Sequence, residues 1–219
     1  MSIQKEIISG LPIFLGLTKR ELESISQSVS FTMRHYKKGA VMAAADDVAN
    51  DIIFITSGWF EAESVADSRA YRIVELLQSS HTVEPDKLFG LNRHYRATYR
   101  ALTPCEVITI SKDSLLELLG NYLIVRLNFL NIICRKSQHL EHNPWRACSQ
   151  TLKGRITDFI KCHSLYPAGN KRLYIKMTQL AAEVNDSRLD VSLALNEMAR
   201  EEHIILKRGI IEIPAMQLL

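Results

Sequence analysis

TQLAAEVNDSRLDVSLALNEM, residues 178–198, contains two short helical patterns separated by a turn. Asn185 lies in the turn, where a residue that tolerates the left-handed conformation is needed, and Asn is the usual substitute for Gly there. Ser187 is the expected N-cap of the second helix. The apolar residues at helical spacing that form its buried face are Val191, Leu195 and Met198. The stretch therefore predicts two helices joined by a tight turn.

The second helix of this stretch leaves a surface uncovered. Arg188, Ser192 and Leu193 fall on its outward side, near the end that reaches base edges in DNA-binding helix-turn-helix motifs. Leu193 is apolar, and the alternative is that it packs under the following hairpin or against the first helix. That hairpin is indicated by HIILKRGIIEIP (203–214), in which two β-branched runs flank a Lys-Arg-Gly turn. Two helices, a tight turn and a hairpin together describe a winged helix-turn-helix.

A long helical pattern precedes this region, from Ser114 to His142, and ends at Asn143 because Pro144 disfavours helix in the residue before it. Its apolar residues cover two faces. One face holds Leu123, Leu127, Leu130 and Cys134, and the other holds Leu119, Tyr122, Phe129 and Ile133. A helix with two apolar faces needs two partners, so we expect one face to cover a β-rich domain and the other to form a homodimer. The alternative is a fully buried helix within a monomer.

Residues 31–111 contain short β-rich segments separated by turn signals, among them DIIFITSG, YRIVELL and CEVITIS. Many short strands at near-regular spacing predict a β-roll, barrel or sandwich. Before them, Thr18 and Glu21 have the spacing of a capping box, which predicts a short helix. We therefore expect an α+β fold: an N-terminal β-roll (double-stranded β-helix), a long dimerisation helix and a C-terminal winged helix-turn-helix.

Composition is typical of a globular protein, with 219 residues, 47% hydrophobic, 23% charged and a net charge of +3. Residues 145–219 hold 11 Lys and Arg against 8 Asp and Glu, an excess that permits a nucleic-acid partner without establishing one. No export signal is visible, and the most apolar stretch, YLIVRLNFLNIIC, is too short to span a bilayer. We expect a cytoplasmic protein with no membrane partner.

The cysteines at 105, 134, 148 and 162 form no C-x-x-C pair and no early cluster that could ligate a metal or an iron–sulfur centre. We expect reduced, structural thiols and no metal site. Cys162 and His163 are neighbours in sequence, and such neighbours on a helix do not face each other, so we expect no catalytic dyad. Nothing else has the pattern of an active site, and we expect no catalytic residues and no enzyme.

Taken in order, these segments resemble the Crp/Fnr transcription regulators over nearly the whole chain. LPIFLGLTKRELESI resembles the family's opening helix, YKKGAVM its first roll strand, DIIFITSGWFEAE its central strand, and RATYRALTPCEVITISKDSLLELL its last strands and the start of its long helix. TQLAAEVNDSRLDVSLALNEM is similar to its helix-turn-helix and REEHIILKRGIIEI to its wing. The resemblance implies a cyclic-nucleotide-binding-like sensor β-roll over 1–112, a dimerisation helix over 113–143 and a winged helix-turn-helix DNA-binding domain over 144–219.

This resemblance also implies a function and a set of residues. The function is that of a sequence-specific DNA-binding transcriptional regulator, controlled by an effector that the sequence does not identify. Its implied partners are a palindromic operator in double-stranded DNA, a second copy of the chain and RNA polymerase. The implied DNA-binding residues are Thr178, Gln179, Ser187, Arg188, Ser192, Leu193, Lys207 and Arg208.

The effector segment departs from the family's cyclic-nucleotide pattern. The nucleotide-binding members carry a Gly-Glu pair and, about ten residues on, an Arg beside a small hydroxyl residue, which hold the ribose and the cyclic phosphate. Here Gly90 is followed by Leu91, and Tyr95 and Arg96 stand where the Arg and the hydroxyl would be. We therefore do not expect ordinary cyclic AMP binding. Arg93 or Arg96, beside Gly90, could hold a different anion, and the alternative is that both are solvated. The clustered N-terminal cysteines of the family's oxygen-sensing branch are absent from this sequence, so no iron–sulfur cluster is expected.

Two other functions stay open. An interaction protein that kept the fold and lost DNA binding is suggested by Leu193, at a position where the family usually has a base-reading Arg, and a DNA-binding assay separates the two. A small metal-dependent enzyme built on the β-roll would need histidines and carboxylates clustered on adjacent strands, which the sequence does not show.

Overall fold

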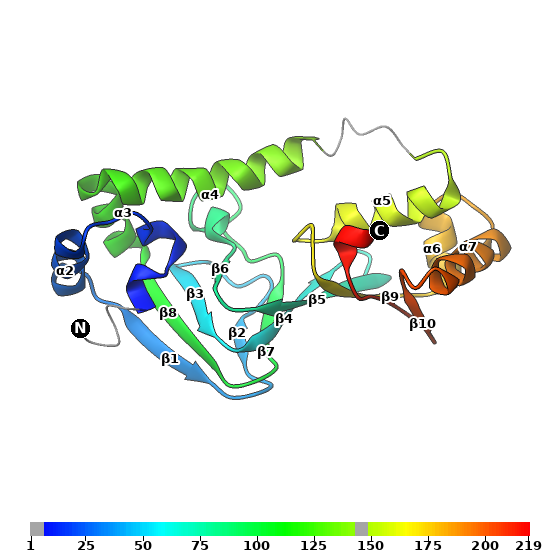
Figure 1. Ribbon diagram of the computed structural model, residues 1–219, viewed down its shortest axis with the longest axis horizontal. Coiled ribbons are helices and arrows are strands. Elements are labelled where there is room, and N and C mark those ends of the chain that lie inside the picture. Colours follow the sequence, from blue (N-terminus) through cyan, green and yellow to red (C-terminus); the bar gives the residue numbers. More distant parts are fainter. Residues whose placement is uncertain (1–6, 143–148) are drawn as a thin grey trace. The chain divides into compact units, whose positions relative to one another are not determined.

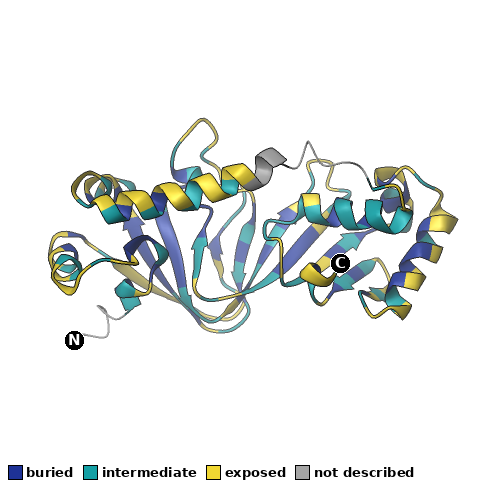
Figure 2. Cartoon of the chain, turned by 45° about the horizontal axis from the view of Figure 1, so that its top comes forward, coloured by how far each residue is buried: buried dark blue, intermediate teal, exposed yellow. Residues whose placement is uncertain are grey.

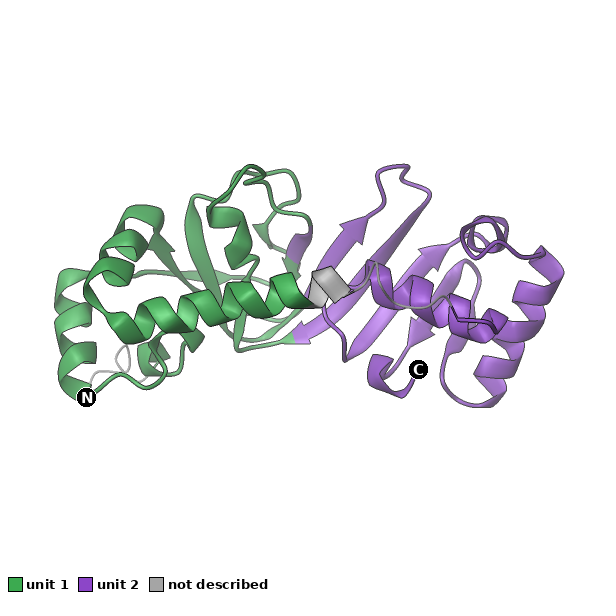
Figure 3. Cartoon of the chain, turned by 90° about the horizontal axis from the view of Figure 1, so that it is seen from above, with its two compact units in different colours: residues 1–60, 78–96, 100–144 green, residues 61–77, 97–99, 145–219 purple. Residues whose placement is uncertain are grey.

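The computed structural model describes residues 7–142 and 149–219. They cluster into two compact units, each built from separate stretches of the chain (Figure 3). Unit 1 comprises Met1–Phe60, Gln78–Arg96 and Arg100–Pro144, and unit 2 comprises Glu61–Leu77, Ala97–Tyr99 and Trp145–Leu219. Residues 61–77, which the sequence suggested for the sensor roll, thus cluster with the C-terminal part of the chain.

Unit 1 begins with the 3-10 turn η1 (Pro12–Phe14) and the helix α2 (Lys19–Ser28). The predicted capping box at the start of α2 is confirmed. The Glu21 N–H donates to the Thr18 hydroxyl (3.3 Å), and the Thr18 N–H donates to the Glu21 carboxylate (2.8 Å). These bonds satisfy backbone N–H groups that the start of a helix leaves without a partner.

An antiparallel sheet is the frame of unit 1 (Figure 1). Its four strands follow the order β1 (Thr32–Tyr36), β8 (Cys105–Ser111), β3 (Asp51–Ser57) and β6 (His81–Val83). The short strands β2 (Val41–Ala43) and β7 (Thr98–Ala101) are neighbours, and the 3-10 turn η2 (Pro85–Leu88) follows β6. Large apolar side chains from the sheet and the helices of this unit form one core, including Phe14, Ile25, Phe54, Ile108 and Leu115.

The single long helix predicted after Asp113 is wrong. The segment forms two helices, α3 (Lys112–Asn121) and α4 (Leu123–His142), with a bend of 118° between Lys112–Asn121 and Leu123–Gln138. Tyr122, between them, has an extended backbone (φ −122°, ψ 106°). Arg126 of α4 reaches back and donates to the carbonyls of Leu119 (2.6 Å) and Gly120 (2.8 Å). The end of a helix leaves such carbonyls without a partner, and a cation also suits the negative end of the helix dipole.

The predicted face with Leu123, Leu127, Leu130 and Cys134 lies on α4, whereas the other is divided by the bend, with Leu119 on α3, Tyr122 between the helices and Phe129 and Ile133 on α4. Phe129 is buried in the core of unit 1, whereas Leu123, Leu127 and Leu130 are 62%, 50% and 49% exposed. Figure 2 shows exposed and less exposed residues alternating along α4. Cys134 is also exposed. The alternative of a helix buried on both faces within one chain is therefore wrong.

Unit 2 contains an antiparallel sheet with helices packed on it. Its strands follow the order β10 (Ile205–Lys207), β11 (Ile210–Ile213), β9 (Asn170–Ile175), β5 (Tyr71–Gln78) and β4 (Trp59–Val65). Its helices are α5 (Leu152–His163), α6 (Met177–Glu183), α7 (Arg188–Arg200) and the 3-10 turn η4 (Met216–Leu218). The strands β4 and β5 come from the middle of the sequence, and β5 pairs with β9 (Figure 1).

The two helices predicted over 178–198 are confirmed as α6 and α7. Asn185, between them, has the expected left-handed backbone (φ 51°). The Ser187 hydroxyl accepts the Asp190 N–H at 3.1 Å and caps α7. The predicted hairpin is present as β10 and β11, with Gly209 (φ 73°) in its turn. The core of this unit joins helix and strand residues, among them Ile156, Leu173, Leu180, Val191, Leu195 and Met198.

The fold is thus mixed, with antiparallel sheets and helices, as the sequence predicts at that level. Over the described ranges 7–142 and 149–219, no single helix has the length and apolarity of a membrane span; only the bent pair α3 and α4, taken together, passes both criteria.

Arg126→Ala should lower the free energy of unfolding by about 1–2 kcal/mol, because two hydrogen bonds from a charged donor to helix-terminal carbonyls are lost on the surface. Thermal melting followed by circular dichroism should show a decrease of about 2–8 °C. Arg135→Ala, an exposed arginine farther along α4, is the control and should change the melting temperature by no more than about 2 °C. Equal effects of the two substitutions would contradict this role for Arg126.

Candidate nucleic-acid interface

The first turns of α7 have one side buried in the core and an opposite side that is exposed. Val191 and Leu195 are fully buried in the core of unit 2, whereas Leu189 and Leu193 are 69% and 60% exposed. Arg188 is exposed at the first position of the helix. The alternative that Leu193 packs under the hairpin or against α6 is therefore wrong, and one side of α7 is left for a partner.

Ser192 and Ser187 are placed differently from Leu193. Ser192 is half-buried, and its carbonyl accepts a hydrogen bond from the Asn196 side chain (2.8 Å). Ser187 is engaged in the cap, where its hydroxyl bonds both the Asp190 N–H (3.1 Å) and the Asp190 carboxylate (2.6 Å). Ser187 therefore orders the first turn of α7, which presents Arg188.

The start of α6 contributes a second set of polar groups. Thr178 is exposed, and Gln179 donates to the Glu183 carboxylate (2.7 Å) one turn later. Lys176, the N-cap residue of α6, is also exposed. Lys176 is not among the residues predicted from the sequence, although a cation just before the first helix of such a motif is the signal that would have found it. Leu189, which precedes the predicted Leu193 by one helical turn, is not in the predicted site either.

The hairpin β10–β11 carries its two cations differently. Lys207 lies 2.8 Å from the Glu212 carboxylate on the opposite strand. This bond is the main cause that lowers the pKa of Glu212, so this carboxylate stays ionised near neutral pH. Arg208 is exposed in the turn beside Gly209, whose positive φ of 73° favours glycine. Arg208 is therefore the more available of the two charges.

Two acidic residues at the end of α7 form ion pairs within the unit, whereas Asp190 and Glu183 bond the neutral side chains of Ser187 and Gln179. Lys153 of α5 bonds Glu201 (2.8 Å) and Glu197 (3.0 Å) at the end of α7. In the part of the chain that the structure describes, no acidic partner is found for Lys176, Arg188 or Arg208. The exposed surface therefore has cations near the start of α6, the start of α7 and the hairpin turn, which together suit a polyanion.

Arg93, predicted as an effector ligand, is engaged inside unit 1. Its Nη2 donates to the carbonyl of Ala49 (3.1 Å) and to Asn50 Oδ1 (3.3 Å), and its Nε is buried without a hydrogen-bond partner. These bonds hold the loop before β3 against the loop before β7. An anion would have to compete with them for the guanidinium.

The surroundings of Arg96 and Gly90 are also unfavourable for a cyclic phosphate. The Arg96 side chain is exposed, and its backbone N–H donates to the carboxylate of buried Glu84 (2.9 Å). Tyr95 is buried, and burial together with the carboxylates of Asp51, Glu84 and Asp47 raises its pKa to about 12. Gly90 is exposed, with φ +88° and open space around its Cα. Three carboxylates around Tyr95 disfavour an anion there, so these residues do not fit cyclic AMP.

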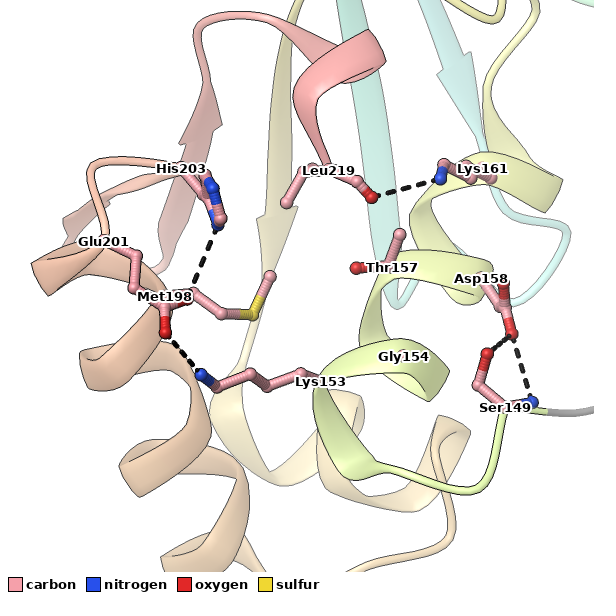
Figure 4. Close-up of a pocket in the computed structure, with 10 residues that line it drawn as sticks. All are labelled: Ser149, Lys153, Gly154, Thr157, Asp158, Lys161, Met198, Glu201, His203 and Leu219. Atoms are coloured by element: carbon pink, nitrogen blue, oxygen red, sulfur yellow. Dashed lines mark hydrogen bonds and ion pairs between the residues drawn. The ribbon is translucent and has the colours of Figure 1, made fainter.

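A cavity of about 360 Å³ lies in unit 2, between α5 and the end of α7 (Figure 4). Its charged lining residues already bond one another or the backbone. Lys153 bonds Glu201, Asp158 accepts from the Ser149 hydroxyl (2.6 Å), and Lys161 donates to a backbone carbonyl (3.2 Å). Because these groups do not converge on one point, the cavity does not resemble a site for a charged effector. No group of three or more metal-ligating side chains occurs among the described residues.

Comparisons with known proteins agree with this architecture. Residues 33–122 match the family model described as cyclic nucleotide-binding domain. A comparison with curated proteins gives no match. Among solved structures, the chain is similar to the c-di-GMP responsive global regulator CLP of Xanthomonas campestris, with 17% sequence identity, a TM-score of 0.50 and coverage of 84% of this chain and 94% of that chain.

Two further structures are similar. The sensor domain of the transcriptional regulator DNR from Pseudomonas aeruginosa has 17% identity and a TM-score of 0.50, covering 66% of this chain and 99% of that one. The catabolite activator protein of Thermus thermophilus has 20% identity and a TM-score of 0.48, covering 92% and 93%. The predicted resemblance to the Crp/Fnr regulators is confirmed at the level of the fold.

Calorimetric titration of the full chain with cyclic AMP should give no dissociation constant tighter than about 1 mM. The reasons are the engaged guanidinium of Arg93 and the carboxylates around Tyr95. A micromolar constant that is lost in Arg96→Ala would contradict this prediction and would make Arg96 the phosphate ligand.

Proposed function

We propose that this chain, whose fold is that of the Crp/Fnr regulators, is a sequence-specific DNA-binding transcription regulator. Residues 144–219 would form its winged helix-turn-helix, residues 113–143 its dimerisation segment and residues 1–112 its sensor roll. The single observation that carries the proposal is α7, which has a fully buried side and, on its first two turns, an exposed side that the protein itself leaves uncovered.

In this proposal α7 lies in the major groove, with Arg188, Ser192 and Leu193 toward the base edges. Leu193 cannot donate to guanine, but its side chain can pack on the C5-methyl group of thymine. Arg188 can form a bidentate contact to guanine or bind a phosphate. Leu189, one turn before Leu193, extends the apolar strip.

The remaining residues would bind the DNA backbone. Thr178 and Gln179, at the start of α6, would donate to phosphates, Gln179 in competition with its bond to Glu183, and Lys176 would add a charge beside them. Lys207 and Arg208 in the wing would contribute mainly sequence-independent attraction. Because Lys207 forms an ion pair with Glu212, we expect Arg208 to contribute more of this electrostatic attraction to DNA.

Assembly as a homodimer follows from α4 in this proposal. The exposed stripe Leu123, Leu127 and Leu130, with Cys134, is apolar surface that a second copy of the same helix can cover. A two-fold axis along this stripe would present two copies of α7 to a palindromic operator, with half-sites about one helical turn, 34–36 Å, apart. RNA polymerase and an unidentified effector would complete the set of partners of a cytoplasmic regulator.

The second candidate function is an interaction protein that keeps the fold without binding DNA. The observation in its favour is the exposed apolar pair Leu189 and Leu193 on α7, which could pack on another protein. We favour DNA, because Lys176, Arg188 and Arg208 are exposed cations at the start of α6, the start of α7 and the hairpin turn.

Replacing Leu123, Leu127 and Leu130 by Gln should convert the dimer into monomers, because each buried leucine contributes about 1.5–3 kcal/mol to an apolar interface. Sedimentation velocity at micromolar concentration measures the change. Leu15→Gln, at a leucine of unit 1 that is 55% exposed, is the control and should stay dimeric. A wild-type chain that sediments as a monomer would contradict the dimer.

The DNA-binding role of α7 is tested by selecting sequences from random duplex DNA with the purified full chain. Leu193→Ala should cost about 1 kcal/mol of discrimination at one symmetric pair of thymine positions, the low end for a base contact. Uracil, which lacks the methyl group, should cost the wild type a similar amount and the Leu193→Ala variant almost nothing. Leu15→Ala is the matched control. A chain that retains no DNA at low salt would exclude the proposal and favour the interaction protein.

The wing should behave differently from Leu193 in the same assay. Removing the charges of Lys207 and Arg208 should reduce the slope of log affinity against log salt by up to about 2 per subunit, with little change in base preference. Leu193→Ala should leave this slope unchanged.

A further inference from the structure

The hairpin formed by β4 and β5 is part of unit 2, although both of its ends continue into the sheet of unit 1. β5 pairs with β9 over six residues, from Tyr71 opposite Ile175 to Leu76 opposite Asn170. β9 in turn pairs with β11 of the wing hairpin. A segment from the sensor half of the sequence therefore supplies a strand to the sheet on which α6 and α7 pack.

Side chains of β5 enter the core beneath these helices. Ile73 is 2% exposed and belongs to the same apolar cluster as Leu180 of α6 and Val191 of α7. Tyr71 packs edge-on against Phe159 of α5, at 5.2 Å between ring centroids, and its hydroxyl bonds His163 (2.9 Å). Removal of β5 would open this core on the side of the sheet.

A buried ion pair fixes β5 to β9. The side chains of Glu75 and Lys171 are each 1% exposed and bond one another. The Glu75 carboxylate also accepts the backbone N–H groups of Leu165 and Tyr166, and Lys171 donates to the carbonyl of Ala168 (3.1 Å). A buried charge that loses its partner is strongly unfavourable, so partial displacement of β5 from β9 is costly unless water reaches both charges.

Both ends of the β4–β5 hairpin are connected by short segments to strands of the unit 1 sheet, β3 and β6. β3 ends at Ser57 and β4 begins at Trp59, while β5 ends at Gln78 and β6 begins at His81. β3 and β6 pair with one another, and β6 is followed by Glu84, whose carboxylate bonds the Arg96 backbone. Gly58, at the first junction, has φ +97°, and a Cβ there would lie 2.5 Å from the Pro104 carbonyl. This junction is therefore tightly packed, and the chain between β3 and β4 is short.

We propose that docking of β5 on β9 is the regulatory contact of this protein, and that undocking of β5 lowers the affinity of α7 for DNA. The inference rests on the proposed DNA-binding function. Docked β5 completes the core under α6 and α7 and holds the helices in the binding arrangement. When β5 leaves, the fraction of chains with ordered helices falls, and the apparent dissociation constant rises by the inverse of that fraction.

The test uses the full chain and the substitution Glu75→Gln, which leaves the buried charge of Lys171 without its counter-charge. Amide hydrogen exchange should become at least about tenfold faster in β9 and in α6 and α7, with residues 107–111 of β8 unchanged. Affinity for the selected DNA should fall at least about tenfold. Glu63→Gln is the control. Glu63 lies on the same hairpin, but its carboxylate forms only a long ion pair of 3.9 Å with the exposed Arg72, so this substitution should change neither measurement.

A crosslink separates loss of docking from general damage. Arg72 and Tyr174 are directly opposite one another on β5 and β9, a spacing that a disulfide can bridge. Arg72→Cys with Tyr174→Cys, oxidised and verified by peptide mass, should restore slow exchange in α7 and DNA affinity to the Glu75→Gln variant. Reduction of the disulfide should remove both again.

The outcomes also separate this inference from the proposed function. If the wild type binds no DNA, the DNA-binding proposal fails, and with it the inference that rests on it; exchange then reports only whether β5 orders α7. If DNA binds but exchange in α7 is the same in Glu75→Gln and wild type, the regulatory contact is wrong and the DNA-binding proposal stands. Failure of the oxidised crosslink to restore both readouts would also overturn the contact.

Discussion

The buried pair Lys171 and Glu75 is the interaction on which the arrangement of unit 2 depends. The two residues are 96 positions apart in sequence, and their charges can be buried only if β5 and β9 pair in one register. A shift of β5 by one residue would turn Glu75 to the other face of the sheet, away from Lys171. Together with the two N–H groups that Glu75 accepts, the pair specifies a strand order that apolar packing alone would leave open. The core under α6 and α7 is then complete.

Short-range sequence signals predict where many helices and turns begin and end, but they do not predict which distant strands pair. The cap at Ser187, the left-handed Asn185 and the capping box at Thr18 are short-range features, and the sequence predicted all of them. The break at Tyr122 was missed, because apolar spacing continues through it and Arg126 stabilises it from the following helix. The assignment of residues 61–77 to unit 2 was missed for a similar reason, since it depends on pairing with a distant strand.

For the candidate site, the sequence predicted which face of α7 is exposed, but not which polar side chains are free to bind a ligand. The period of α7 distinguishes its buried residues from Leu193, which the structure leaves exposed. Availability of a polar side chain is a different property, because it depends on neighbours from other elements. Arg93 is engaged by Ala49 and Asn50, and Gln179 is engaged by Glu183. A sequence motif indicates which residue types are present, whereas these partners decide which of them can still bind a ligand.

Charge pairing explains why the order of α7 would control its binding. Lys207 is partly neutralised by Glu212, and Lys153 is occupied by Glu197 and Glu201. Among the described residues of unit 2, Lys176, Arg188 and Arg208 are exposed cations without an acidic partner. Sequence-independent affinity grows with the number of phosphates that such cations neutralise, so a small number would bind DNA weakly in an arbitrary orientation. Binding would depend instead on contacts from a helix held in one position. When α7 is disordered, electrostatic attraction alone would add little affinity for DNA. A strand such as β5 that orders α7 would therefore have a large effect on the affinity.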